Sequence, residues 1–319
     1  MKKMKHIAAS LVFLGGLVAI LLVLSAVMMP RYEGYNFIEV EKKLDALAKE
    51  KEETIDVIIV GDSETYSAYS PLHIWKEHGI TSYICGTHAQ RLCDTMSVLT
   101  SAFESQSPKV VVLEANSLFR TASLDPKSDD ATRSNLEKVF PVLKYHNGWK
   151  QALNLVDISE QNKMKRESIR KGFKLRNGVQ AYKGGEWMHE NEKRAKFGEL
   201  VDGYLKDIYE LCKENGAELI LISTPAPENW TYAKHNAVSD WAKENAVEYL
   251  DMNFAHKDMN IDWAKDTRDG GDHLNYAGAK KVTAYFGKYL KNNYDLADHR
   301  EDVNYSSWDE DVKNSGMVF

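Results

Sequence analysis

The sequence contains a serine, a histidine and two aspartates, which are the residue types that acyl transfer requires. Ser63 follows the apolar run 55–60 in "IDVIIVGDSET", and His273 lies in "DTRDGGDHLNYAGA" between Asp269, Asp272 and the last helical stretch. A serine hydroxyl becomes a useful nucleophile when a neighbouring base removes its proton. A histidine supplies that base, and an aspartate fixes its tautomer and stabilises the imidazolium. Asp269 and Asp272 both remain candidates for this role, with Asp269 favoured because the glycines at 270 and 271 permit a bend.

The oxyanion that forms during acyl transfer needs donors that are already in place. We expect the backbone N–H groups of Ser63 and Gly86 and the side-chain amide of Asn116 to supply them. Each of these residues also has a purely structural explanation: Ser63 as a helix cap, Asn116 as a turn residue and His273 as a residue at a helix start. The joint placement of these side chains, each after a different predicted strand, favours the catalytic interpretation.

Alternation of short apolar runs with amphipathic stretches predicts an α/β fold with a doubly wound, parallel five-stranded sheet, as in flavodoxin-like proteins. The predicted strands are Ile55–Val60, Thr81–Cys85, Lys109–Glu114, Glu218–Ser223 and Val247–Leu250. The predicted helices are Pro71–His78, His88–Ser105, Lys196–Asn215, Thr231–Asn245 and a last one from Tyr276 to Asn293. The carboxyl ends of parallel strands meet at one edge of the sheet, so the candidate residues should meet there too.

Residues 120–196 interrupt the alternation between the third and fourth predicted strands. We interpret this segment as a partly helical insertion that shapes substrate binding. Its aromatic cluster "YHNGW" holds Tyr145, His146 and Trp149, which are suited either to stacking on a sugar or to packing the insertion against the sheet. His88 opens a predicted helix beside the expected site, and we assign it to packing or substrate contact.

The first thirty residues predict a membrane segment. Three lysines precede an apolar run from about residue 7 to 29, long enough to cross a hydrocarbon core of about 30 Å. The segment "VLSAVMMP" at the end of the apolar run is a poor signal-peptidase site, which favours an uncleaved signal anchor over a cleaved signal peptide. The basic residues would stay in the cytoplasm and the bulk of the chain outside, in a single-pass topology. An amphipathic helix in 31–54 would link this anchor to the α/β domain at 55–294, followed by an acidic, loosely packed tail at 295–319.

Charge and cysteine content exclude several functions. The chain has 41 basic and 47 acidic residues, and no basic patch stands out, so nucleic acid is not an expected partner. The three cysteines, Cys85, Cys93 and Cys212, have neither the number for a disulfide framework nor the spacing of a zinc site. Cys85 and Cys93 remain candidates for a disulfide or for small buried side chains. The sequence implies no metal and no nucleotide cofactor, because Gly61-Asp62-Ser63 lacks the phosphate-loop pattern.

Over residues 55–292 the motifs resemble the blocks of the SGNH (GDSL-type) hydrolase superfamily. The resemblance is carried by "GDSET" after a strand, by Gly86, by Asn116 and by the terminal loop with His273. It implies that Ser63 is the nucleophile, that Gly86 and Asn116 hold the oxyanion and that His273 is the base. Two blocks depart from the family pattern: the third is "EANS" rather than Gly-x-Asn-Asp, and the aspartates precede His273 by four residues and by one, not by three.

The single amino-terminal anchor makes the chain resemble the extracytoplasmic branch of that family, which includes alginate-acetylation and teichoic-acid D-alanylation proteins. That resemblance implies an esterase or O-acyltransferase acting on a cell-surface polysaccharide or teichoic-acid-like polymer, with a membrane-bound acyl-donor protein as a possible partner. The altered third block and the altered block around His273 leave an alternative function of another class, a catalytically silent binding or scaffold module of an envelope-polymer complex.

Overall fold

In the computed structural model, five parallel strands form one sheet in the order β2-β1-β3-β4-β5. The structure describes residues 2–28, 37–122, 139–145 and 158–319. The strands are β1 (Val57–Val60), β2 (Ser82–Ile84), β3 (Val110–Glu114), β4 (Glu218–Ser223) and β5 (Glu248–Asp251). This confirms the predicted α/β fold and its parallel five-stranded sheet.

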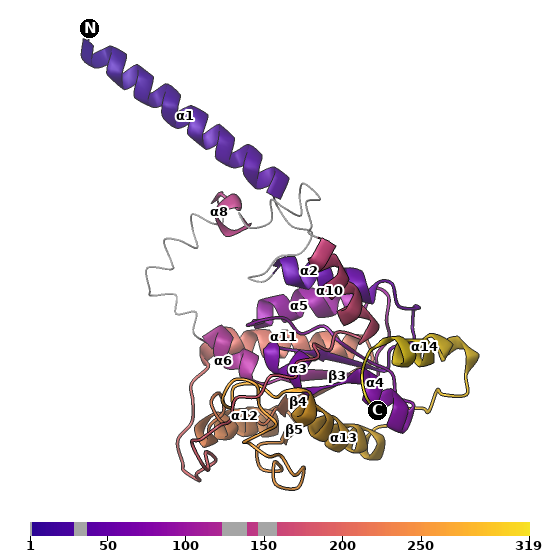
Figure 1. Cartoon of the computed structure of the whole chain (residues 1–319). Helices are drawn as coiled ribbons and strands as arrows, with labels where there is room; N and C mark the ends of the chain where they lie inside the picture. The colour runs from indigo at the N-terminus through magenta and orange to yellow at the C-terminus, as the bar shows by residue number, and fades with distance from the viewer. Residues whose placement is uncertain (1, 29–36, 123–138, 146–157) are drawn as a thin grey trace.

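Alternate residues of the central strands point into two separate cores, so helices cover both faces of the sheet (Figure 1). Ile58 and Val60 of β1 face one core, whereas Val57 and Ile59 face the other. The first core contains residues of α2 (Phe37–Leu47), α5 (Leu92–Ala102), α6 (Asn116–Ala122), α11 (Gly198–Glu214) and α12 (Tyr232–Glu244). The second contains residues of α3 (Ser63–Ala68), α4 (Pro71–His78) and α13 (Tyr276–Asn293). These two layers leave the carboxyl edge of the sheet for the loops that carry polar side chains.

The first helix, α1 (Lys2–Met28), extends away from the α/β domain (Figure 1). Its segment His6–Met28 has a mean hydropathy of 2.8 and is long and apolar enough to cross a membrane. After it, α2 buries Val40, Leu44 and Leu47 against the first core, as its predicted apolar face requires.

Two parts of the chain differ from the sequence prediction for identifiable reasons. The helix expected from His88 begins at Leu92, because the side chain of Gln90 instead accepts a hydrogen bond from the Gly61 N–H and donates one to the Cys85 carbonyl. The expectation of a loosely packed tail was wrong. After the short 3-10 helix η2 (Val303–Tyr305), α14 (Ser306–Asn314) buries Trp308 against Trp75 of α4, with 5.5 Å between the ring centroids.

The described part of the connection between β3 and β4 includes helices and a long irregular segment. Its helices after α6 are α8 (Val142–Tyr145) and α10 (Ile158–Ile169). Residues 173–197 then cross the loop between β5 and α13, where Gln180 N–H bonds to Thr267 O and Tyr182 N–H to Trp263 O. This segment therefore supports the loop that carries His273. Cys85 and Cys212 are buried free thiols, so Cys85 forms no disulfide.

Candidate active site

Ser63 is the first residue of α3, at a sharp turn after β1. Gly61 makes the turn with φ of 135°, and a Cβ there would lie 2.6 Å from the Cβ of Glu114. Asp62 caps the helix by accepting the Glu64 N–H at 3.2 Å. The Ser63 N–H therefore lies in the first turn of a helix, where backbone donors have no partner within the helix. Ser63 itself is only 1% exposed.

The loop before α13 brings His273 back toward this turn. An isolated antiparallel bridge joins Thr267 to Leu274, and the Arg268 N–H bonds to the His273 carbonyl at 3.1 Å. Asn275 then caps α13 by accepting the N–H groups of Ala277 and Gly278. The cap and the bridge together hold the backbone of His273 at the end of a short hairpin.

Ser63 and His273 are neighbours although 210 positions separate them along the chain. The Ser63 Oγ lies 2.7 Å from His273 Nε2, and Asp269 Oδ2 lies 2.7 Å from His273 Nδ1. Asp269 Oδ1 also accepts the backbone N–H of His273 at 2.6 Å. Asp272 approaches the same Nδ1 at 3.1 Å, so both candidate aspartates contact the ring and Asp269 makes the shorter contact.

Two glycines form the bend that brings Asp269 against His273. Gly270 and Gly271 have φ values of 79° and 104°, in the region that disfavours other residues. A Cβ on Gly271 would lie 2.8 Å from the Tyr182 ring and 2.9 Å from Pro227. The segment that crosses the loop therefore packs directly on the bend.

Gly271→Ala is expected to destabilise the fold by about 1–3 kcal/mol, because it combines a strained φ with two steric clashes. Thermal unfolding measures this loss. Gly185→Ala is the matched control, since Gly185 has φ of 79° and no atom lies within 4 Å of the place that an added Cβ would take. An equal loss in the two variants would mean that backbone strain alone is responsible and that packing on Tyr182 contributes nothing.

The surroundings of His273 favour its protonated form. Burial alone would lower its pKa, but hydrogen bonds to Asp269 and Asp272 and the nearby Glu64 raise the pKa to about 10. The imidazolium is the form that a general base reaches in the transition state. The same stabilisation means that, at neutral pH, only a minor fraction of the resting site holds the neutral base.

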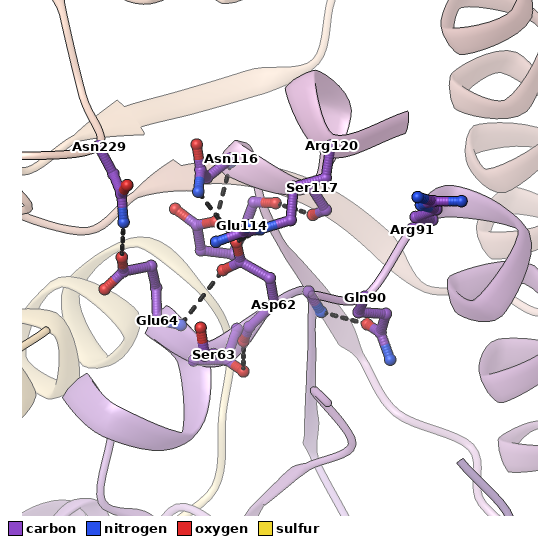
Figure 2. A network of polar contacts seen from close by, with 12 residues as sticks. Asp62, Ser63, Glu64, Gln90, Arg91, Glu114, Asn116, Ser117, Arg120 and Asn229 are labelled. Carbon is purple, nitrogen blue, oxygen red and sulfur yellow. Dashed lines mark hydrogen bonds and ion pairs between the residues drawn. The ribbon is translucent and has the colours of Figure 1, made fainter. Parts of the chain in front are cut away.

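Figure 2 shows a network of buried carboxyl groups beside Ser63. Asp62, Glu64 and Glu114 are each at most 1% exposed. Burial, together with neighbouring carboxylates, raises the pKa of Glu64 to about 8 and that of Glu114 well above its usual range. Glu64 is therefore predominantly neutral at pH 7, and burial favours the neutral form of Glu114 as well. Glu64 lies in the first turn of α3 and is buried.

Two cations and two amides complete this network. Arg120 Nε donates to Asp62 Oδ2, and Asn229 Nδ2 donates to both Glu64 and Asp272. Lys234 Nζ donates to Asn116 Oδ1 at 2.9 Å and to the Asn229 carbonyl at 2.6 Å. Burial lowers the pKa of Lys234 despite the acidic neighbours that oppose this. The network thus fixes Asp62, the residue that caps the serine-bearing helix.

The expected oxyanion residues lie beside the turn at Ser63, but Asn116 has other contacts. Its Nδ2 donates to Asp62 Oδ2 at 2.9 Å, which uses one of the two hydrogens of the amide. Gly86 lies at the end of β2 against Thr65 of α3, and a Cβ there would lie 1.9 Å from the Thr65 hydroxyl. Only glycine lets these two segments approach so closely.

Of the four predicted substrate-contact residues, the structure describes the side chain of His88 alone. His88 is exposed, and its backbone N–H donates to Glu39 of α2 at 2.9 Å. Tyr145 is the last residue of α8, and its side chain lies outside the described part of the chain. His146 and Trp149 lie outside the described residues altogether.

Sequence reasoning missed Glu64, Glu114, Arg120, Asn229 and Lys234. The one available signal was the replacement of the family's third-block glycine by Glu114 in "EANS". Of the missed residues, Glu64 also lies with Asp272 and His273 in a group whose ligand atoms are within 4.8 Å of one another. Glu64 Oε1, Asp272 Oδ1 and both ring nitrogens of His273 already have partners in Asn229, Ser63 and Asp269, whereas the buried Glu64 Oε2 makes no hydrogen bond within the described residues.

No protein-family model and no curated protein matches this chain. Among solved structures it is similar to a GDSL-like lipase from Bacteroides thetaiotaomicron, with 14% identity, a TM-score of 0.40 and coverage of 82% of this chain and 100% of that chain. It is also similar to a proposed acylhydrolase from Bacteroides fragilis, with 12% identity, a TM-score of 0.42 and coverage of 82% and 99%. At these scores the matches carry no argument about the site, which rests on the contacts of this chain itself.

Proposed function

We propose that the protein is an SGNH-type serine esterase or O-acyltransferase that acts through an acyl-serine intermediate. The observation that carries the proposal is the continuous contact from Ser63 Oγ to His273 Nε2 and from His273 Nδ1 to Asp269, each 2.7 Å long. These are the nucleophile–base and base–orienter contacts that covalent acyl transfer requires.

In the first half-reaction, the Ser63 oxygen attacks the carbonyl carbon of an ester while His273 Nε2 takes the hydroxyl proton. The tetrahedral intermediate then expels an alcohol, which receives that proton from His273. The first-turn N–H of Ser63, the Gly86 N–H and the remaining Asn116 N–H are the donors proposed for the oxyanion. One such donor is typically worth about 10²–10³ in rate.

In the second half-reaction, an acceptor hydroxyl attacks the acyl-serine and gives its proton to His273 Nε2. The serine oxygen leaves and takes the proton back. Water as acceptor gives hydrolysis, and a sugar hydroxyl gives O-acyl transfer. We favour transfer to a cell-surface polysaccharide or teichoic-acid-like polymer, because α1 would hold the domain outside the membrane where a membrane acyl donor could reach it.

Covalent labelling tests the nucleophile. A fluorophosphonate probe is expected to label the full chain, and Ser63→Ala should abolish the labelling. Ser67→Ala is the matched control, because Ser67 lies one turn further along α3 and donates to the Ser63 carbonyl. Labelling that persists in Ser63→Ala would contradict the assignment of the nucleophile.

Products then separate the two activities. After incubation with an acetyl ester and an acceptor glycan, free acetate alone indicates an esterase and acetylated glycan indicates a transferase.

The alternative function is a catalytically silent polymer-binding module. It is favoured by Asn116, whose amide is held by Asp62 and Lys234 on both sides. That alternative predicts neither labelling nor product, with polymer binding retained in Ser63→Ala.

A further inference from the structure

A cavity of about 780 Å³ lies between α2, α10 and the edge strand β2. Its lining shares no residue with the contacts among Ser63, His273 and Asp269. Figure 1 shows α2 and α10 packed side by side over one end of the α/β domain. The cavity is therefore separate from the candidate active site and is formed by segments that lie about 120 positions apart in the chain.

Lysines predominate in the wall of this cavity. Its charged residues are Lys42, Lys43, Lys49, Lys163, Lys165 and Lys174, with Glu39, Asp45 and Glu167 as the acids. Lys174 is paired with Glu39 at 2.6 Å, which leaves the wall with an excess of positive charge. In a chain with more acidic than basic residues overall, this concentration of lysines is unusual.

Two buried donors in the wall have hydrogens to spare. Lys43 is 6% exposed, and its Nζ donates to the Gly172 carbonyl at 2.9 Å and lies over the Tyr66 ring, 5.9 Å from its centroid. No carboxylate of the described residues lies within ion-pair distance of this Nζ. An ammonium group carries three donors, so two remain. Tyr83 is fully buried, and its hydroxyl makes no hydrogen bond within the described residues. Ser168 influences the pKa of Tyr83 without completing a hydrogen bond to it.

Lys43 attracts an incoming anion, whereas the carboxylate of Glu167, whose buried Oε1 has no hydrogen-bond partner among the described residues, opposes it. Burial and then the charge of Lys174 lower the pKa of Lys43 to about 8, although Glu167 and Glu39 oppose this. A buried cation with a neutral partner is costly, and a hydrogen-bonded anion offsets that cost. The remaining hydrogens of Lys43 and Tyr83, together with the lysines of the wall, match the several oxygen acceptors of a phosphate group.

Apolar residues and the position of α2 favour a lipid as the source of that phosphate. Ile38, Ala46 and Met164 line the cavity beside the lysines, which suits a ligand with an apolar portion. Phe37 begins α2 nine positions after Met28 ends α1, so the chain between them spans at most about 30 Å. With α1 in a membrane, a connection of this maximum length keeps α2 near the lipid headgroups.

We propose that the cavity between α2 and α10 binds the phosphate of a membrane lipid headgroup through Lys43 and Tyr83. The lysines at its rim attract the anion, and the apolar wall receives the first methylene groups of the acyl chains. The site is separate from Ser63 and does not depend on the proposed acyl transfer. It would orient the domain on the membrane surface.

Binding of short-chain lipids to the full chain in a neutral detergent tests the proposal. Dihexanoyl phosphatidylglycerol is expected to bind at least about tenfold more tightly than inorganic phosphate, dihexanoyl glycerol or a lipid-free glycerol-phosphate polymer, because only it offers both the anion and the apolar portion. Equal or tighter binding of inorganic phosphate or of the polymer would overturn the lipid assignment. Absence of phosphatidylglycerol binding would overturn the site.

Variants locate the binding. Lys43→Met should weaken phosphatidylglycerol binding about tenfold or more, and Tyr83→Phe should weaken it several-fold, roughly the loss of one charge-assisted hydrogen bond each. Lys213→Met, on the exposed face of α11, is the matched control and should bind as the parent does. Lys43→Met replaces a buried charge with an apolar side chain of similar length, so thermal unfolding should show a retained fold. Unchanged binding in folded Lys43→Met would contradict the proposal.

Discussion

Asp269→Asn is expected to lower the limiting kcat/KM for ester cleavage by about 10³–10⁴, the loss typical when the carboxylate that orients a catalytic histidine is neutralised. Asp269 contacts His273 twice, through the ring Nδ1 and through the backbone N–H. An asparagine would keep the size of the side chain. It would also allow its NH₂ group to face Nδ1, which favours the wrong tautomer of the ring.

Asp272→Asn is the matched comparison, because the same change is made on the same loop. Asp272 makes the longer contact with Nδ1, at 3.1 Å, and bonds to Asn229 through its other oxygen. We expect a loss of about tenfold or less for this variant. Both rates should be taken at the alkaline limit of the pH profile, where the charge state of His273 no longer differs between the variants. The reverse order of losses would make Asp272 the orienting residue.

The fold and the central contact were predictable because both follow from local patterns. Apolar runs followed by polar residues placed Ser63 and His273 at the carboxyl edge of a parallel sheet. The two glycines before His273 indicated a bend, and a bend at that point brings Asp269 within reach of the ring.

The rest depended on burial, which no local pattern encodes. Glu64 looks like an ordinary acid at a helix start, but burial and the nearby Asp62 raise its pKa to about 8, against the opposing effects of His273 and of the Asn229 hydrogen bond. The packing of Trp308 against Trp75 and the cavity between α2 and α10 likewise join segments far apart in sequence. A resemblance to four short blocks specifies the residues within those blocks and leaves these long-range contacts undetermined.

The kcat/KM for ester cleavage is expected to depend strongly on pH. With the pKa of His273 raised to about 10, the neutral base is the minor form at neutral pH. The kcat/KM of the parent chain is therefore expected to rise by about tenfold per pH unit from roughly pH 6 to pH 8, because the rate follows the fraction of neutral imidazole. Above about pH 8 the rise should be less steep, because Glu64 ionises beside the ring and favours the imidazolium. The rate of fluorophosphonate labelling should rise in the same way, since it depends on the same base.

Removing one carboxylate should move this profile in a known direction. Asp272→Asn takes away an anion that favours the imidazolium, so the pKa of His273 falls and the midpoint should shift about one pH unit or more toward acid. The ratio of variant to parent rate then increases as the pH is lowered. Asp240→Asn, at an exposed position on α12 paired with Arg194, is the control for a general change of charge and should leave the midpoint in place.

Glu64→Gln distinguishes the effect of Glu64 on the pKa of His273 from the effect of Asp272. The pKa of Glu64 is raised to about 8, so below that pH the glutamate is already neutral, and glutamine should leave the rate near pH 7 within about threefold of the parent. Above pH 8 the parent gains a negative charge beside His273 that the variant lacks. The variant should therefore reach its plateau at lower pH. A shift as large as that of Asp272→Asn already at neutral pH would mean that Glu64 is ionised there, and that Ser63 lies beside a charged rather than a neutral carboxyl group.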